Sequence, residues 1–376
     1  MSRSPLQEAL GAQMTTEGLP VGEDEYRGAM TTPWFCGVHE EFAALTNGCG
    51  VYDLGFRARI SITGGDRVRW MNGMVTNNIR DLPAGRGAYA FLLNPQGRIL
   101  GDMVVYNEGE RLTVETDRSQ LEKILATFDH YIIMDDVEVA NISDEWTALG
   151  VAGPRARTVL NSAGIAVPEL QPLQTHAAQC TCECDCLECS AVRGENEQHE
   201  SYEIWLRPKD ILKTWRALIA AGATAVGSHA IEMQRVVEGV PQYGIDIRER
   251  DLPQETEQVR ALNFSKGCYV GQEIVERIRS RGNVHRKFTG FFAEGAAKIG
   301  SGEKIIYGEK EVGEITSVAI LRTPAGERTV ALGYIRREVG LPGREVALGS
   351  VKAMVTELPF DGVALGLTRE SLVQQS

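Results

Sequence analysis

Long apolar runs and an excess of basic charge are both missing from the sequence. No stretch approaches the roughly 20 apolar residues that a membrane span requires, and the polar residues 1–13 contain no apolar signal core. Basic residues number 39 against 51 acidic ones, which gives a formal net charge of −12. Such an acidic chain is a poor candidate for binding a nucleic-acid backbone. We therefore expect a cytoplasmic protein with neither a membrane segment nor a stable nucleic-acid partner.

The composition is that of a folded globular protein. Apolar residues make up 43% of the chain and charged residues 24%, which argues against a disordered protein. A length of 376 residues is enough for two or three domains. Five of the eight cysteines fall within residues 180–189, and in a reducing compartment they are expected to be thiols or ligands rather than disulfides.

Hydrophobic periodicity predicts a mixed α+β region at about residues 56–142. Alternating apolar residues predict strands, whereas apolar residues at helical spacing predict helices, the first of which follows a candidate N-cap, Asp66. Strand, helix, strand, strand, helix and strand, with one additional strand, form the order of a ferredoxin-like unit. The predicted strands are 57–63, 88–94, 97–106, 111–116 and 135–142, and the predicted helices are 66–77 and 119–131.

The pattern changes after about Arg286. Short β runs separated by glycine follow, which predicts a small all-β barrel or sandwich. Further strands are expected at 146–153 and 202–208, and a helix at 231–240. We place the domain boundary so that a core of two interleaved α+β subdomains occupies residues 1–288 and a β-barrel domain occupies residues 289–376.

The most specific motif is Lys-Gly-Cys-Tyr-Val-Gly-Gln-Glu at residues 266–273. Glycines on both sides allow the backbone around Cys268 to turn tightly. The cationic Lys266, with Arg277 and Arg281 further on, is expected to favour a Cys268 thiolate and to attract an anionic ligand. An isolated cysteine in such a loop is more often simply buried, but a run of eight residues favours a functional thiol.

This run resembles the signature of the YgfZ family, Lys-Gly-Cys-Tyr/Phe-x-Gly-Gln-Glu, and matches it at every position. In that family the cysteine at the position of Cys268 is the functional hallmark. The family is linked to the maintenance of iron–sulfur proteins.

A second group of residues lies in the strand around Asp102. Because side chains alternate along a strand, Asp102, Val104 and Tyr106 share one face. A carboxylate on an apolar face is costly to bury without a partner. The alternative is a strand-end aspartate that faces water.

The segment resembles the folate site of the glycine-cleavage T-protein family. There a Gly-Gly-x-x-Asp-Asp-x-x-Val-Tyr run places its second Asp beside the reacting nitrogens of tetrahydrofolate, and Asp102 matches this residue, although Gly101 replaces the first Asp. The resemblance implies that Tyr89, Val104 and Tyr106 line the pocket. It also implies that Glu203 accepts hydrogen bonds from the pterin, a role that suits a carboxylate.

Two departures separate the chain from T-proteins. Their Ala-Arg-Asp run, before the helix that contains Arg235, is replaced by residues 228–230, Ser-His-Ala. Their Gly-Tyr-Thr-Gly-Glu loop is replaced by Arg193-Gly194-Glu195 and a polar stretch. Both changes disfavour a lipoamide-linked aminomethyltransferase.

A cysteine-rich segment occupies a position where the family has a variable loop. Its thiolates have spacings that can bind zinc, copper(I) or an iron–sulfur cluster, but the intervening acidic residues repel further negative charge. A structural or lineage-specific loop is favoured slightly over a metal site. The cysteines are Cys180, Cys182, Cys184, Cys186 and Cys189.

The sequence thus predicts an α+β protein with an aminomethyltransferase-type folate-binding fold, a ferredoxin-like part and a small C-terminal β-barrel. The favoured function is a tetrahydrofolate-binding accessory protein, with iron–sulfur enzymes or assembly factors as partners. The alternative is a folate-dependent one-carbon transferase, and whether turnover occurs is left open. The cofactor expected is tetrahydrofolate or a one-carbon derivative. Cys268 and Asp102 are the expected reactive residues, and Lys266, Arg235, Arg277 and Arg281 are expected to meet the folate and its anionic tail.

Overall fold

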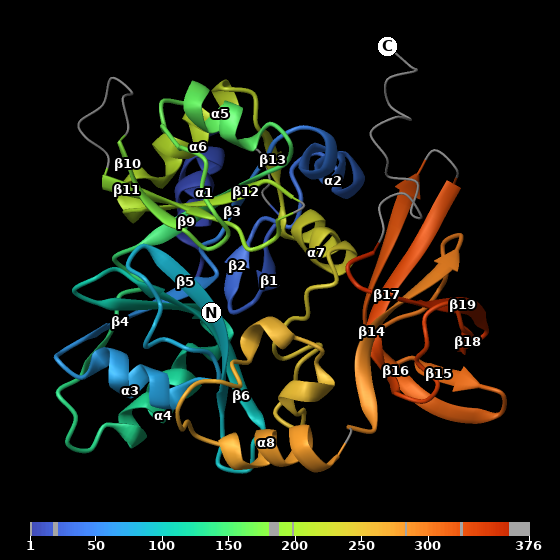
Figure 1. Ribbon diagram of the computed structural model, residues 1–376. Coiled ribbons are helices and arrows are strands. Elements are labelled where there is room, and N and C mark those ends of the chain that lie inside the picture. Colours follow the sequence, from blue (N-terminus) through green and yellow to red (C-terminus); the bar gives the residue numbers. More distant parts are fainter. Residues whose placement is uncertain are drawn as a thin grey trace. The chain divides into compact units, whose positions relative to one another are not determined.

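The computed structural model describes residues 2–17, 22–179, 188–197, 199–282, 284–323 and 326–360 (Figure 1). The chain divides into two compact units that are interleaved in sequence. The first unit comprises Met1–Leu92, Asp102–Ile231 and Ser265–Tyr269, and the second comprises Leu93–Gly101, Glu232–Phe264 and Val270–Ser376. The predicted boundary at residue 288 stays a prediction. None of the described helices has the length and hydrophobicity needed to cross a bilayer.

A five-stranded sheet in the first unit confirms the ferredoxin-like prediction. Its strand order is β5-β6-β7-β4-β8. Along strands β4 and β7, apolar residues alternate with polar ones, so one face of the sheet is apolar and the other carries charged side chains. The elements are β4 (Arg57–Thr63), α3 (Arg67–Met74), β5 (Arg86–Leu93), β6 (Ile99–Asn107), β7 (Leu112–Asp117), η1 (Arg118–Gln120), α4 (Leu121–Tyr131) and β8 (Glu138–Asn141).

The structure confirms Asp66 as the N-cap residue of helix α3, but the Asp66 side chain makes no capping hydrogen bond. Its carboxylate instead accepts from the backbone N–H of Asp136 at 3.0 Å and from Arg69 at 3.2 Å. The Asp66 carboxylate thus accepts from these two donors and not from the N–H groups of the first turn of α3.

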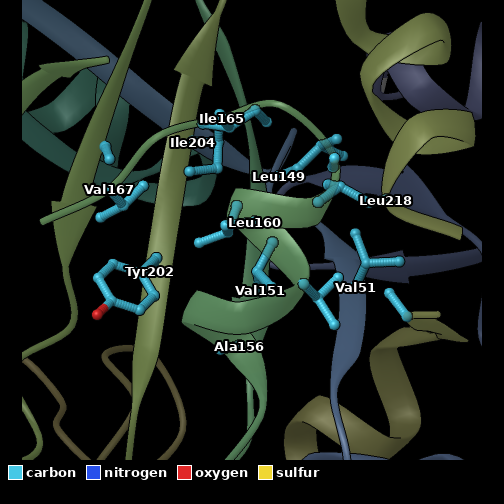
Figure 2. Packing of buried hydrophobic residues seen from close by; sticks show 14 of the residues in the cluster. Val51, Leu149, Val151, Ala156, Leu160, Ile165, Val167, Tyr202, Ile204 and Leu218 are labelled. Carbon is cyan, nitrogen blue, oxygen red and sulfur yellow. The ribbon is translucent and has the colours of Figure 1, made fainter. Parts of the chain in front are cut away.

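A second, six-stranded sheet of the first unit has the order β10-β11-β12-β9-β3-β13. Its main hydrophobic core includes residues of helices α1, α5 and α6 (Figure 2). Tyr202, Ile204 and Leu206 of β12 point into this core, so the intervening residues of β12 lie on the other face. The elements are α1 (Pro5–Glu17), β3 (Gly50–Asp53), β9 (Thr147–Ala152), α5 (Ala156–Ser162), β10 (Thr175–Gln179), β11 (Glu188–Arg193), β12 (Ser201–Leu206), α6 (Ile211–Ala220) and β13 (Thr224–Val226).

The N-terminal segment is joined to β3 by a partly buried carboxyl group. Asp53 accepts hydrogen bonds from the Ser4 hydroxyl and, at 2.8 Å, from the backbone N–H of Gly55. Burial raises the pKa of Asp53 to about 6. The neighbouring elements are a hairpin of β1 (Asp24–Tyr26) and β2 (Ala29–Thr31) and helix α2 (Val38–Asn47).

The second unit contains the predicted barrel, which closes in the strand order β14-β17-β16-β15-β18-β19 and is drawn in orange and red in Figure 1. Apolar side chains from all six strands fill its interior. The strands are β14 (Arg286–Glu294), β15 (Lys304–Tyr307), β16 (Lys310–Thr323), β17 (Gly326–Arg336), β18 (Glu345–Leu348) and β19 (Val351–Thr356).

Helices α7 (Ser228–Val237) and α8 (Gln272–Arg281) complete the described α-helices. The sequence predicted α7 a few residues late and did not predict α8. Gly271, with a φ of 81°, makes the turn immediately before α8, a backbone conformation that favours glycine. The glycine at this position of the motif therefore starts a helix.

Candidate functional site

Asp102 lies at the centre of a hydrogen-bonded group in the first unit. The Tyr89 hydroxyl donates to its Oδ2 at 2.7 Å, and Gln120 Nε2 donates to its Oδ1 at 2.8 Å. Gln120 also accepts from the Asp102 backbone N–H at 3.0 Å. Burial, reinforced by the negative charge of Asp117, raises the pKa of the Asp102 carboxyl group. A partly exposed carboxyl group held in this way has a fixed orientation.

Two rows of charged residues lie on the same face of the five-stranded sheet. Arg57 is paired in register with Asp117, and Arg59 with Glu115. The guanidinium of Arg57 lies 2.8 Å from Asp117, and that of Arg59 lies 2.7 Å from Glu115. Since Arg59 and Glu115 are completely buried, their ion pair is shielded from water.

Glu203 extends from β12 of the other sheet towards this charged face. Its Oε2 accepts from Trp205 Nε1 at 2.9 Å, and its negative charge acts on both Arg57 and Glu115. The Arg59 guanidinium lies 4.5 Å from the centre of the Trp205 ring. The two sheets therefore meet through their charged and aromatic side chains, with Glu203 partly exposed at the junction.

Val104 and Tyr106 are buried on the same face of β6. Tyr106 packs edge-on against Trp205, with ring centres 5.0 Å apart. Its ring also fills the space above Gly87, where an added Cβ would lie 2.6 Å from it. This packing supports the position of Trp205 and, through Trp205, of Glu203. The prediction that Val104 and Tyr106 contact a ligand stays a prediction.

Lys266 anchors the cysteine motif to the C-terminal end of helix α3. Its ammonium group donates to the backbone carbonyls of Asn72, Val75 and Asn77, each at 2.6 Å. Burial lowers the pKa of Lys266 to about 7, but only the charged form has three N–H groups for the three carbonyls. This geometry gives Lys266 a positioning role, and a direct contact with a ligand stays a prediction.

Cys268 lies two residues further on and its side chain is exposed. The residues on either side of Gly267 and Cys268, Lys266 and Tyr269, are both buried, and the Lys266 ammonium lies 5.0 Å from the centre of the Tyr269 ring. The segment therefore exposes a thiol between two fixed points in the first unit.

Replacing Lys266 by Met should lower the free energy of unfolding by about 3 kcal/mol, because three buried carbonyls lose a charged donor. Urea denaturation measures this change. The matched control is Lys209→Met, which alters an exposed lysine and should change stability by less than about 0.5 kcal/mol. Equal stabilities of the two variants would contradict the anchoring role.

The three predicted arginines belong to the second unit. All five N–H groups of Arg235 point at protein acceptors, since its guanidinium contacts Glu232, Val240, Asp246 and Ser317. Arg277 is exposed and lies 3.3 Å from Glu273. Arg281 ends helix α8, and its side chain lies outside the described part of the chain. Tail binding by these residues stays a prediction.

Of the cysteine-rich segment, only Cys189 is described. It is buried on β11, its Sγ lies 3.6 Å from the carbonyl of Ala178, and burial raises its pKa to about 11. A neutral thiol in this setting is a structural residue. Cys180, Cys182, Cys184 and Cys186 lie outside the described residues, so the predicted alternatives for this segment stay open.

Sequence reasoning did not identify Gln120, Glu115 or Trp205 as parts of this site. One signal was available for Glu115, because the alternation of β7 places Thr113, Glu115 and Asp117 on one polar face. Nothing local marks Gln120, whose contact with Asp102 joins residues 18 positions apart.

The fold is that of the aminomethyltransferases. A crystal structure of the glycine cleavage system aminomethyltransferase T from Bartonella henselae superimposes with a TM-score of 0.82 at 20% identity, covering 96% of this chain and 98% of that one. An aminomethyltransferase of Rubrobacter xylanophilus is 28% identical over 370 residues, which cover 96% of this chain and 94% of the relative. One of Halothermothrix orenii is 25% identical, with 96% and 100% covered.

Residues 5–266 match the GCVT N-terminal domain family. The chain therefore belongs to this family. The predicted membership of the glycine-cleavage T-protein superfamily is confirmed.

Proposed function

We propose that this protein binds tetrahydrofolate and serves as an accessory factor for iron–sulfur enzymes, as the YgfZ motif implies. The observation that carries the proposal is the combination, in one unit, of an oriented Asp102, a partly exposed Glu203 and an exposed Cys268. The relatives are named aminomethyltransferases, which supports a folate ligand. The complete eight-residue motif around Cys268 favours the accessory role.

The residues present suit a reduced folate. A pterin offers an amino group and a ring N–H along one edge, and a carboxylate accepts from both. Glu203 has this chemistry, and Trp205 fixes its orientation. Tyr89 and Gln120 likewise fix Asp102. When bound, the folate would supply the one-carbon or reducing chemistry.

In this proposal each side chain has a separate role. Glu203 orients the pterin. Asp102, whose pKa is raised by burial, accepts a hydrogen bond from a folate nitrogen and stabilises positive charge there. Lys266 positions the segment that carries the Cys268 thiol.

A one-carbon transferase of the glycine-cleavage type is the second candidate. It is favoured by the Asp102 group, because a carboxyl group with a raised pKa is suited to proton transfer. It is disfavoured by Ser228-His229-Ala230 in place of the Ala-Arg-Asp run of T-proteins.

Calorimetric titration with tetrahydrofolate tests folate binding, which both candidate functions require. We expect a micromolar Kd, which corresponds to about −8 kcal/mol; the absence of binding would overturn the proposal. Reconstitution with aminomethylated lipoyl carrier protein and tetrahydrofolate then separates the candidates. The accessory role predicts no ammonia release above background, whereas release at enzymatic rates would establish the transferase.

A further inference from the structure

Glu115 is a buried acid whose second oxygen lacks a donor. Its Oε1 accepts from Arg59 at 2.7 Å. Among the described residues, no N–H or O–H group donates to Oε2, and the Arg57 guanidinium lies 3.8 Å from it. The Glu203 carboxyl group also lies within reach of a hydrogen bond with Glu115, but as a carboxylate it offers an acceptor and no donor. Two ionised carboxylates cannot form a hydrogen bond, because neither has a proton to donate.

We propose that Glu115 and Glu203 share one proton, and that Glu115, by donating this proton, holds the Glu203 carboxylate in the orientation that receives the pterin edge of a folate. The inference rests on the proposed function, because it gives Glu115 a positioning role in the same site. Glu203 is then held from two directions, by the Trp205 N–H and by the Glu115 O–H.

The charges around Glu115 are consistent with one retained proton. Burial and the negative charge of Glu203 together raise its pKa to about 7, although the positive charges of Arg59 and Arg57 act in the opposite direction. The groups that face the pair come from four strands. They are Arg57 and Arg59 on β4, Tyr106 on β6, Asp117 on β7 and Glu203 itself on β12.

The shared proton makes folate binding depend on pH. Above about pH 7 Glu115 loses its proton, and the two like charges then repel each other and misalign Glu203. We therefore expect the Kd of the wild type for tetrahydrofolate to rise roughly tenfold to thirtyfold between pH 6 and pH 8.5.

The test is the same titration with Glu115→Gln. The glutamine amide keeps an oxygen for Arg59 and an N–H for Glu203 at every pH. We expect a Kd close to the wild-type value at pH 6 that stays constant up to pH 8.5. A merely structural role of Glu115 would weaken binding equally at all pH values. Either that result, or a variant whose Kd depends on pH as that of the wild type does, would overturn the inference. Asp53→Asn, at another acid of the same unit whose pKa is raised, should keep the wild-type profile.

A measurement without ligand separates this inference from the proposed function. Because Glu115 binds its proton more tightly in the folded state, the wild-type Tm should fall as pH rises from about 4.5 through 7. Glu115→Gln should remove that contribution, and Glu203→Gln, which takes away the opposing anion but not the burial, should reduce it. Absence of folate binding would overturn the proposed function. If instead the Tm of both variants fell with pH as steeply as that of the wild type, the shared proton would be overturned.

Discussion

Glu203→Ala should raise the Kd for tetrahydrofolate about 100-fold. The substitution removes a carboxylate that is positioned to accept two hydrogen bonds, which corresponds to a loss of about 2.7 kcal/mol of binding free energy. It also leaves Trp205 Nε1 without its acceptor. Calorimetric titration of the variant and of the wild type at pH 6 measures the effect.

Glu200→Ala is the matched control for this experiment. Glu200 lies just before β12 and accepts from the hydroxyl of Tyr202 at 2.9 Å, and Tyr202 points into the hydrophobic core. The control removes a carboxylate close in sequence to Glu203, and its Kd should stay within about threefold of the wild type, which is under 0.7 kcal/mol. If Glu203→Ala and the wild type bound tetrahydrofolate equally well, Glu203 could not be a pterin ligand.

Cys268→Ala should abolish the support of iron–sulfur enzymes. In a host strain that lacks its own copy, the activity of a hydro-lyase that requires an iron–sulfur cluster should stay at the level of the deletion strain when this variant is expressed. The physical reason is that alanine has no thiol, whereas the Lys266 and Tyr269 anchors are unchanged. Enzyme activity in cell extracts, corrected for the amount of variant protein, is the measurement.

Cys36→Ala offers a control of the same chemistry, because Cys36 is the other exposed free cysteine of the described residues. It should restore the activity fully. Tetrahydrofolate binding by Cys268→Ala should also be unchanged, since the proposed pterin contacts come from other elements. If Cys268→Ala restored the activity of the iron–sulfur enzyme fully, the accessory role could not depend on the Cys268 thiol, and the proposal would fail.

Local pattern was enough to predict most of the elements. The ferredoxin-like order and the barrel were both predicted, because alternation and glycine placement are local properties. Asp102 was placed with Tyr89 by resemblance, and the structure joins them by a hydrogen bond. Helix α8 was missed because the motif around Cys268 was interpreted as a loop.

The contacts that orient the site could not be predicted from local pattern. Arg59 and Glu115 are 56 positions apart, and both lie in strands whose alternation is equally compatible with a solvated face. The packing of the second sheet, through Trp205 and Glu203, covers this face. Lys266 was expected to serve Cys268 or an anionic ligand, whereas its three acceptors lie at the end of a helix about 190 positions earlier in the chain.

The distance along the chain between Lys266 and its acceptors has a consequence for biosynthesis. Residues 72–77 leave the ribosome long before residue 266. The carbonyls at the end of helix α3 therefore lack the Lys266 ammonium group while most of the first unit is synthesised. The same holds for a truncated product that ends before residue 265, which contains both sheets but leaves these three carbonyls without Lys266. Such a fragment is expected to expose an incomplete α3 terminus to chaperones and proteases until the cysteine motif has been translated.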